Sequence, residues 1–126
     1  MTDVTFVVAI APYHKDIAQR AIESAQAQDV PCSVITAYDE HMRGAGVARN
    51  AALSLVKTDF TVILDADDFV DSNFVSRCLS VWQENHYIFC DWLEGETRKV
   101  APDCPYTNKT WHPITTLIPT EWLHRV

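Results

Sequence analysis

Two short and almost wholly apolar runs, residues 4–11 and 60–64, constrain the fold of this chain most strongly. Both are rich in β-branched residues, and both are far shorter than the roughly 18 apolar residues that a membrane-spanning helix needs. Strands that are buried on both faces of a parallel sheet have this composition. The first run is ended by Pro12, and the second leads directly into Asp65. The sequence therefore predicts an α/β fold with a mainly parallel sheet.

The segments between and after these runs have the apolar period of helices. One helical pattern follows the first run, and a second begins after Gly44 and Gly46, whose backbone freedom permits an unusual path into it. A third pattern begins with Ser72 as its predicted N-cap, and further strands are predicted at 34–37 and 86–93. Strands thus alternate with helices, as parallel neighbours require, because each pair needs a crossover connection.

The composition limits the classes of partner. The 126 residues suffice for one domain, and 48% hydrophobic with 21% charged residues excludes a disordered chain. The net charge of −7, with no stripe of Lys and Arg, excludes a nucleic-acid surface. No apolar stretch is long enough to span a membrane, and the first residues lack the basic region of a signal peptide, so we expect a cytoplasmic protein.

The acidic run Asp65-Ala66-Asp67-Asp68 follows the second apolar strand, at the edge where parallel sheets bind their ligands. Residues two apart on a strand face the same side, so we expect Asp65 and Asp67 together and Ala66 facing away. Their like charges repel unless a cation lies between them, and carboxylate oxygens suit Mg²⁺ or Mn²⁺. The alternative is a solvated loop whose only role is to cap the next helix.

The segment R-G-A-G-V-A-R-N, residues 43–50, has two interpretations as well. Its glycines would let the backbone approach a phosphate, with Arg49 adding positive charge, although the spacing matches neither a Walker loop nor a dinucleotide fingerprint. In the alternative, the segment is an ordinary helix start and Arg49 is tied to an internal carboxylate.

Three segments together resemble the family 2 glycosyltransferases of the GT-A fold, a Rossmann-like three-layer sandwich. They are V-V-A-I-A-P-Y-H, G-A-G-V-A-R-N-A-A-L and V-I-L-D-A-D-D-F-V, and their order and spacing agree with the family over residues 4–82. The resemblance implies an enzyme that moves a sugar, with inversion, from a UDP-type nucleotide donor to the hydroxyl of a carbohydrate or other acceptor. It also implies that residues 1–94 bind the nucleotide sugar and that residues 95–126 begin the acceptor side of one domain.

The resemblance assigns roles to individual residues. It implies a Mn²⁺ or Mg²⁺ ion that is held by Asp67 together with Asp65 and that bridges the diphosphate. Asp68 and His112, with Thr115 or Thr116, would line the donor pocket. The residues that would contact the nucleotide sugar are Pro12 and Tyr13 at the base, Asp39 at the base or ribose, Arg49, Asp65, Ala66 and Asp67.

The catalytic base is missing from this assignment, because the family places it in an acidic motif downstream of the last residue here. Asp91 and Glu94 are candidates on position alone. The alternative function is therefore a nucleotide-sugar-binding module or fragment that is inactive without an acceptor half. A phosphoryl-accepting receiver domain and a nucleotidyltransferase are disfavoured, because residues 12–14 supply neither an acidic pair nor a glycine-rich basic loop.

The cysteines and tryptophans support weaker hypotheses. A zinc site made of Cys90, Cys104 and His112 lacks regular spacing, and reduced thiols are the simpler interpretation. The tryptophans fit core packing or a homo-oligomer contact better than a sugar-stacking platform; they are Trp82, Trp92, Trp111 and Trp122. A short final helix is predicted from Thr120.

Overall fold

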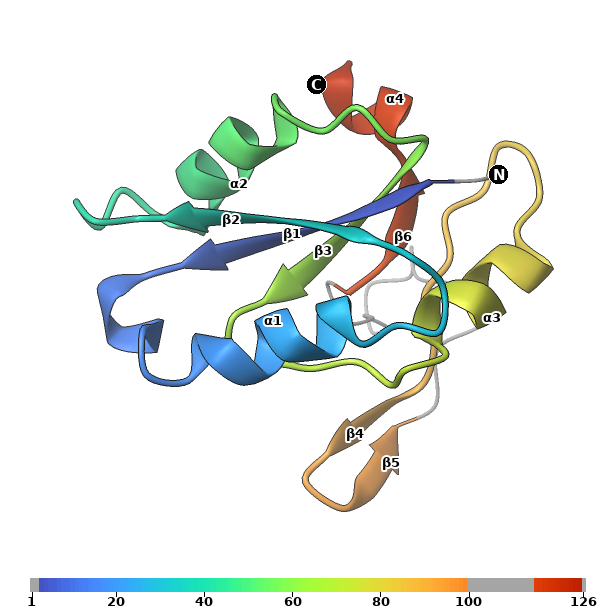
Figure 1. Cartoon of the computed structure of the whole chain (residues 1–126), viewed down its shortest axis with the longest axis horizontal. Helices are drawn as coiled ribbons and strands as arrows, with labels where there is room; N and C mark the ends of the chain where they lie inside the picture. Colours follow the sequence, from blue (N-terminus) through green and yellow to red (C-terminus); the bar gives the residue numbers. More distant parts are fainter. Residues whose placement is uncertain (1–2, 100–114, 126) are drawn as a thin grey trace, which may run out of the picture.

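The computed structural model describes residues 3–99 and 115–125, and its centre is a four-stranded sheet (Figure 1). The strand order is β2-β1-β3-β6. The first three strands are parallel, and β6 is antiparallel to β3. Their bounds are Val4–Ile10 for β1, Ser33–Tyr38 for β2, Phe60–Asp65 for β3 and Leu117–Pro119 for β6. The predicted α/β fold with a mainly parallel sheet is confirmed.

Helices cover both faces of this sheet and give the fold three layers (Figure 1). On one face α1 (Ala18–Gln26) and α3 (Phe74–Val81) enclose the larger core, in which Phe6 is fully buried. On the other face α2 (Ala45–Leu53) packs on the sheet, with Val7 in the smaller core. Alternate residues of β1 thus point into different cores, which explains why its sequence is apolar at nearly every position.

The register of the strands brings their carboxyl ends to one edge. Ala9 of β1 lies opposite Asp65 of β3, and Ile10 lies opposite Tyr38 of β2. A backbone hydrogen bond from the Asp39 N–H to the Ile10 carbonyl, 2.8 Å, extends the β1–β2 pairing by one more residue. The loops that leave these strands therefore start side by side.

The chain after α3 differs from the prediction. Residues 86–93 are not one strand: Ile88 makes a single bridge to Leu117, and β4 (Trp92–Glu94) pairs with β5 (Thr97–Lys99) in a separate hairpin. The edge of the main sheet next to β3 is occupied by β6, so the segment that precedes the hairpin meets the sheet only through its single bridge to β6.

Two helix ends can be compared with their predictions. The predicted N-cap Ser72 is wrong, because Asn73 occupies that position and makes no side-chain cap, while the Ser72 carbonyl accepts a hydrogen bond from the Asp29 N–H. The predicted final helix is confirmed as α4, Thr120–His124. Within residues 3–99 and 115–125, no helix has the length and apolar character needed to cross a bilayer.

The role of β6 in closing the sheet leads to a stability prediction. Leu117 is fully buried, lies opposite Val62 and bridges to Ile88, so it joins three segments. Leu117→Ala is expected to lower the free energy of unfolding by about 2–5 kcal/mol through the cavity it creates. Urea unfolding measures the change. The half-buried neighbour Ile118 is the control, and an equal or larger loss for Ile118→Ala would contradict this account of the edge.

Candidate functional site

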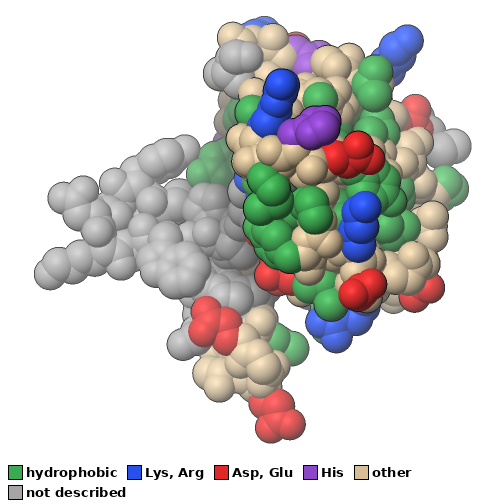
Figure 2. All heavy atoms as spheres, turned by 90° about the vertical axis from the view of Figure 1, so that its left-hand side faces the viewer, with side chains coloured by type: hydrophobic (Ala, Val, Ile, Leu, Met, Phe, Trp, Pro, Cys, Tyr) green, Lys and Arg blue, Asp and Glu red, His purple; other side chains and the backbone are tan. Residues whose placement is uncertain are grey.

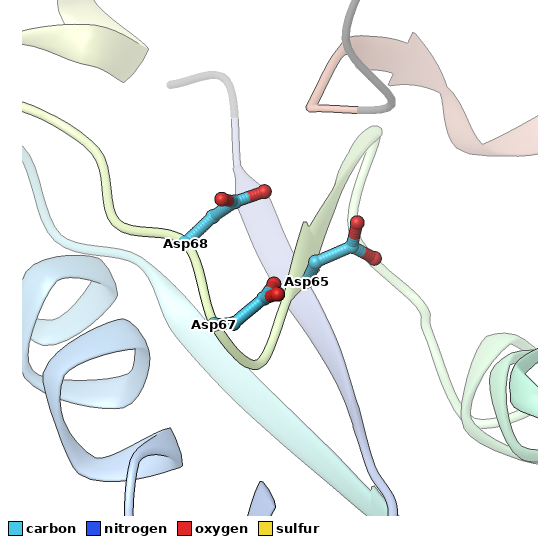
Figure 3. Close-up of side chains that lie close together, drawn as sticks. All are labelled: Asp65, Asp67 and Asp68. Carbon is cyan, nitrogen blue, oxygen red and sulfur yellow. The ribbon is translucent and has the colours of Figure 1, made fainter. Parts of the chain in front are cut away.

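The acidic run forms a tight turn directly after β3. A backbone hydrogen bond from the Asp68 N–H to the Asp65 carbonyl, 3.1 Å, closes the turn, and Ala66 points into the core with 1% of its surface exposed. Asp65, Asp67 and Asp68 each offer a carboxylate oxygen, and these oxygens lie within 4.8 Å of one another. Figure 3 shows Asp65 at the end of the strand and Asp67 and Asp68 on the turn that leaves it. The expected pairing of Asp65 and Asp67 is present, and Asp68 joins it.

Arg49 of α2 forms an ion pair with Asp65, with 2.5 Å between Nη2 and Oδ1. Both side chains are partly buried, with 22% and 33% of their surfaces exposed. The structure therefore contains the arrangement of the second interpretation above, in which Arg49 is tied to an internal carboxylate. The pair also places a guanidinium next to the acidic turn, and the second oxygen of Asp65 remains available to a ligand.

The electrostatics of the turn favour a bound cation. Burial raises the pKa of the Asp68 carboxyl, the negative charges of Asp67 and Asp65 raise it further, and Arg20 opposes the rise. Three carboxylates at this spacing are costly unless positive charge is present. Because all the donors are oxygens, the set suits a hard ion such as Mg²⁺ or Mn²⁺ and does not suit a thiolate-binding metal.

The loop after β1 reaches the same edge of the sheet. Residues Pro12–His14 form a 3₁₀ turn, and the Tyr13 ring is 69% exposed with its centroid 4.3 Å from that of His14. The Nδ1 atom of His14 is buried without a hydrogen-bond partner among the described residues. Figure 2 faces this side of the molecule and shows hydrophobic side chains gathered among charged ones. The edge therefore offers an aromatic and partly apolar surface near the acidic turn.

Asp39, at the end of β2, is used by its own loop. Its two carboxylate oxygens accept hydrogen bonds from the N–H groups of Arg43 and Gly44, at 2.8 and 2.7 Å. Within this loop Met42 has a φ of 53° and Gly44 has a φ of 107°. Glycine tolerates such positive φ angles best, because it has no side chain. Asp39 therefore fixes the path from β2 into α2, and its contact with a base or ribose stays a prediction.

The remaining candidates lie elsewhere or outside the described residues. Asp91 is ion-paired with Arg98 across the β4–β5 hairpin, and Glu94 is exposed within that hairpin. Thr116 is buried next to β6, with 4% of its surface exposed. His112 lies outside the described residues, as do Cys104 and Trp111, so neither the donor-pocket role of His112 nor the zinc hypothesis is tested.

The thiols and Trp82 have structural explanations. Burial raises the pKa of Cys78 to about 12 and also raises the pKa values of Cys32 and Cys90, which disfavours the reactive thiolate form. Trp82 packs edge-on against Phe60 with ring centroids 4.9 Å apart, as expected for core packing. A cavity of about 720 Å³ also involves these two rings, but it lies at the other end of β3 from the acidic turn.

Three residues on the α1 side of the acidic run make contacts that the sequence did not predict. Arg20 is exposed, and its guanidinium lies 4.1 Å from the centroid of the Phe69 ring. Ser24 and Gln28 make hydrogen bonds to residues 70, 71 and 75. Their spacing of four residues was the available signal, but polar residues at that spacing usually indicate only a solvated helix face.

The sequence matches a model of a known protein family over most of its length. Residues 13–123 match the family model described as Glycosyl transferase family 2. The chain belongs to this family. No curated protein gives a significant match to the sequence.

The solved structures with a similar fold include those of S. aureus TarS. A crystal structure of TarS in complex with UDP-GlcNAc has a TM-score of 0.77 at 16% identity, covering 98% of this chain and 47% of that one. The complex with UDP has a TM-score of 0.75 at 15% identity, covering 98% and 48%. At these identities the likeness shows the GT-A fold. The chain spans about half the length of these TarS structures.

The raised pKa of Asp68 predicts how the acidic turn affects stability. The folded chain holds the Asp68 proton to a higher pH than the unfolded chain does. The contribution of Asp68 to stability is therefore most favourable below the unfolded pKa and is lost as the pH rises through the folded pKa. In metal-free buffer at pH 7, Asp68→Asn is expected to raise the melting temperature by a few degrees at most, because solvent screens part of the repulsion.

Thermal unfolding in the presence of a chelator, over a pH series, measures this effect. The gain should shrink as the pH falls toward the ordinary range of aspartate carboxyls. Asp16→Asn removes the same charge from an exposed loop before α1 and serves as the control. A gain that is equal for both variants, or that does not change with pH, would contradict the repulsion described for this turn.

Proposed function

We propose that this chain is the donor-binding part of a metal-dependent glycosyltransferase that uses a UDP-sugar and transfers the sugar to an acceptor hydroxyl. The observation that carries this proposal is the convergence of three carboxylates in one turn, at the carboxyl end of a parallel strand, in a family 2 domain. The TarS structures with UDP and UDP-GlcNAc support the choice of donor, since they share the fold.

Asp67 and Asp68 would hold Mn²⁺ or Mg²⁺, with the free oxygen of Asp65 as a further ligand. When bound, the ion supplies positive charge that stabilises the departing nucleoside diphosphate. Arg49 neutralises part of the charge of Asp65 and adds a cation on the α2 side of the turn. In a protein with a net charge of −7, these groups would make a local site that attracts an anionic diphosphate.

The nucleoside would lie on the edge formed by the ends of β1 and β2. The exposed ring of Tyr13 offers a flat surface for a base, and Pro12 precedes it in the same turn. Asp39 accepts one amide at each carboxylate oxygen, and each oxygen can accept a second hydrogen bond from a base or a ribose hydroxyl. Donor binding would thus draw on three neighbouring loops.

The transfer would invert the anomeric carbon by a single displacement. The acceptor oxygen forms a bond to that carbon, the bond from the carbon to the diphosphate oxygen breaks, and a base takes the acceptor proton. Asp91 and Glu94 stay predictions for this role: Asp91 is ion-paired with Arg98, and Glu94 belongs to the β4–β5 hairpin. The base therefore stays unassigned.

The metal dependence of UDP binding tests the donor site. Isothermal titration of UDP with and without Mn²⁺ should show affinity at least about tenfold higher with the metal, which is a gain of about 1.4 kcal/mol. Asp67→Ala should abolish the gain, and Asp59→Ala, which removes an exposed carboxylate just before β3, at the end opposite the acidic turn, should retain it. UDP binding that is independent of the metal and unchanged in Asp67→Ala would refute the site.

A second function, a nucleotide-sugar-binding module without turnover, is supported by the ion pair that engages Asp91, one of the two base candidates, with Arg98. Incubation of the purified chain with Mn²⁺ and a panel of UDP-sugars, with UDP release as the signal, separates the two functions. A transferase should release UDP in an acceptor-dependent manner. Saturable donor binding without hydrolysis or transfer would favour the binding module.

A further inference from the structure

The segment that follows the acidic turn is fastened along one side of α1. The chain between β3 and α3 runs beside this helix (Figure 1), and three α1-side residues contact it in order along its length. Arg20 stacks on Phe69, and the Ser24 hydroxyl accepts a hydrogen bond from the Val70 N–H at 3.2 Å. Gln28, just beyond the end of α1, makes the next contacts. The order of the contacts follows the order of the residues in both segments.

Gln28 uses the full hydrogen-bonding capacity of its side-chain amide except for one carbonyl lone pair. Its Nε2 group donates to the Asp71 carbonyl at 2.8 Å and to the Ser24 carbonyl at 3.0 Å. Its Oε1 atom accepts from the Val75 N–H at 3.0 Å. One side chain therefore connects the end of α1, the loop after the acidic turn and the first turn of α3.

The neighbouring residue Asp29 strengthens the same connection. Its N–H donates to the Ser72 carbonyl at 2.7 Å, and its carboxylate accepts a hydrogen bond from the Ser76 hydroxyl at 2.8 Å. At the other end, the turn begins at Asp65, which pairs with Ala9 in the sheet. The chain that carries Asp67 and Asp68 is thus short and fixed at both ends.

We propose that Arg20, Ser24 and Gln28 are positioning residues that hold the acidic turn in the arrangement that binds the metal. The inference rests on the proposed function. Carboxylates without a cation repel one another, so a loosely held loop would separate them. Fixing the loop in advance removes that reorganisation from the binding step and raises the affinity for the ion.

Arg20 adds a charge effect to this positioning. Its guanidinium packs over Phe69, the residue after Asp68, so a positive charge lies beside the acidic turn. Because the three residues are four positions apart, they lie on the same side of the helix and its end. The same spacing explains how one helix can contact a loop at successive points.

The test compares substitutions that remove these contacts with matched controls. Gln28→Met keeps the length of the side chain and removes its hydrogen bonds. Gln26→Met is its control, because Gln26 is exposed on the same helix. Ser24→Ala removes the acceptor for the Val70 N–H. Its control is Ser54→Ala, because Ser54 makes the same local bond to the carbonyl three residues earlier without a bond to another segment.

Mn²⁺ affinity is measured by titration well below the melting temperature of each variant, so that a general loss of stability leaves it unchanged. Gln28→Met is expected to weaken Mn²⁺ binding about five- to tenfold and Ser24→Ala about two- to threefold, with both controls unchanged. Amide hydrogen exchange should become faster in residues 66–75 and stay at the wild-type rate in β1. Should Gln28→Met fail to fold, Ser24→Ala decides the question.

The outcomes separate this inference from the proposed function. Wild-type protein that does not bind Mn²⁺ would refute the metal site itself. Wild-type protein that binds Mn²⁺, together with unchanged affinity in Gln28→Met and Ser24→Ala, would overturn the positioning role even if exchange in residues 66–75 increased. Weakened binding in the controls as well would show a general effect and would also overturn it.

Discussion

The pairing of β1 with a parallel strand on each side is the constraint on which the rest of the molecule depends. Because β1 lies between β2 and β3, it is buried on both faces and is hydrogen-bonded on both edges. The three parallel strands accordingly carry no charged side chain before their carboxyl ends. The register then sets the ends of all three strands at one edge of the sheet, so that the loops starting at Pro12, Asp39 and Asp65 become neighbours.

Each of the two helical layers places one arginine near the acidic turn. Arg49 reaches it from α2 on one face of the sheet, and Arg20 lies near it from α1 on the other. Two guanidinium groups do not offset three carboxylates, and the raised pKa of Asp68 reflects the remaining repulsion together with burial. The turn is therefore held by the protein in a state that a divalent ion would stabilise, as in other preorganised binding sites.

The parts of the fold that follow from burial could be predicted from the sequence. A strand that is buried on both faces is apolar at nearly every position, as in Phe60–Asp65. Because the acidic run follows the end of this strand, Asp65 and Asp67 lie close together. The pairing partner of a strand could not be predicted in this way, because the apolar residues at 86–93 do not indicate which edge of the sheet is free. That edge is taken by β6, where Leu117 is fully buried, and the segment forms only one bridge.

The side-chain contacts around the site also could not be predicted from the sequence. Ser72 resembles an N-cap, yet hydrogen bonds from Gln28 and Asp29 hold the adjoining backbone, and the helix begins one residue later than that cap implies. Arg20 belongs to an exposed helix face, and nothing in its own helix indicates that Phe69, from a distant segment, packs against it. Contacts between segments that are far apart in the chain depend on the topology of the fold, and the helical period of apolar residues does not predict them.

The chemistry of the turn also restricts where the acceptor base can be. Burial raises the pKa of Asp68, the direction that makes a carboxylate more basic, but the same carboxylate would be a ligand of the proposed cation, and a bound cation favours its charged, less basic state. A group that holds the ion cannot also take the acceptor proton efficiently. The ion pair of Asp65 with Arg49 also favours the charged, less basic form of that carboxylate. In the proposed transferase the base would therefore be separate from the acidic turn and would face it from the acceptor side, so donor binding and proton removal would be physically divisible functions.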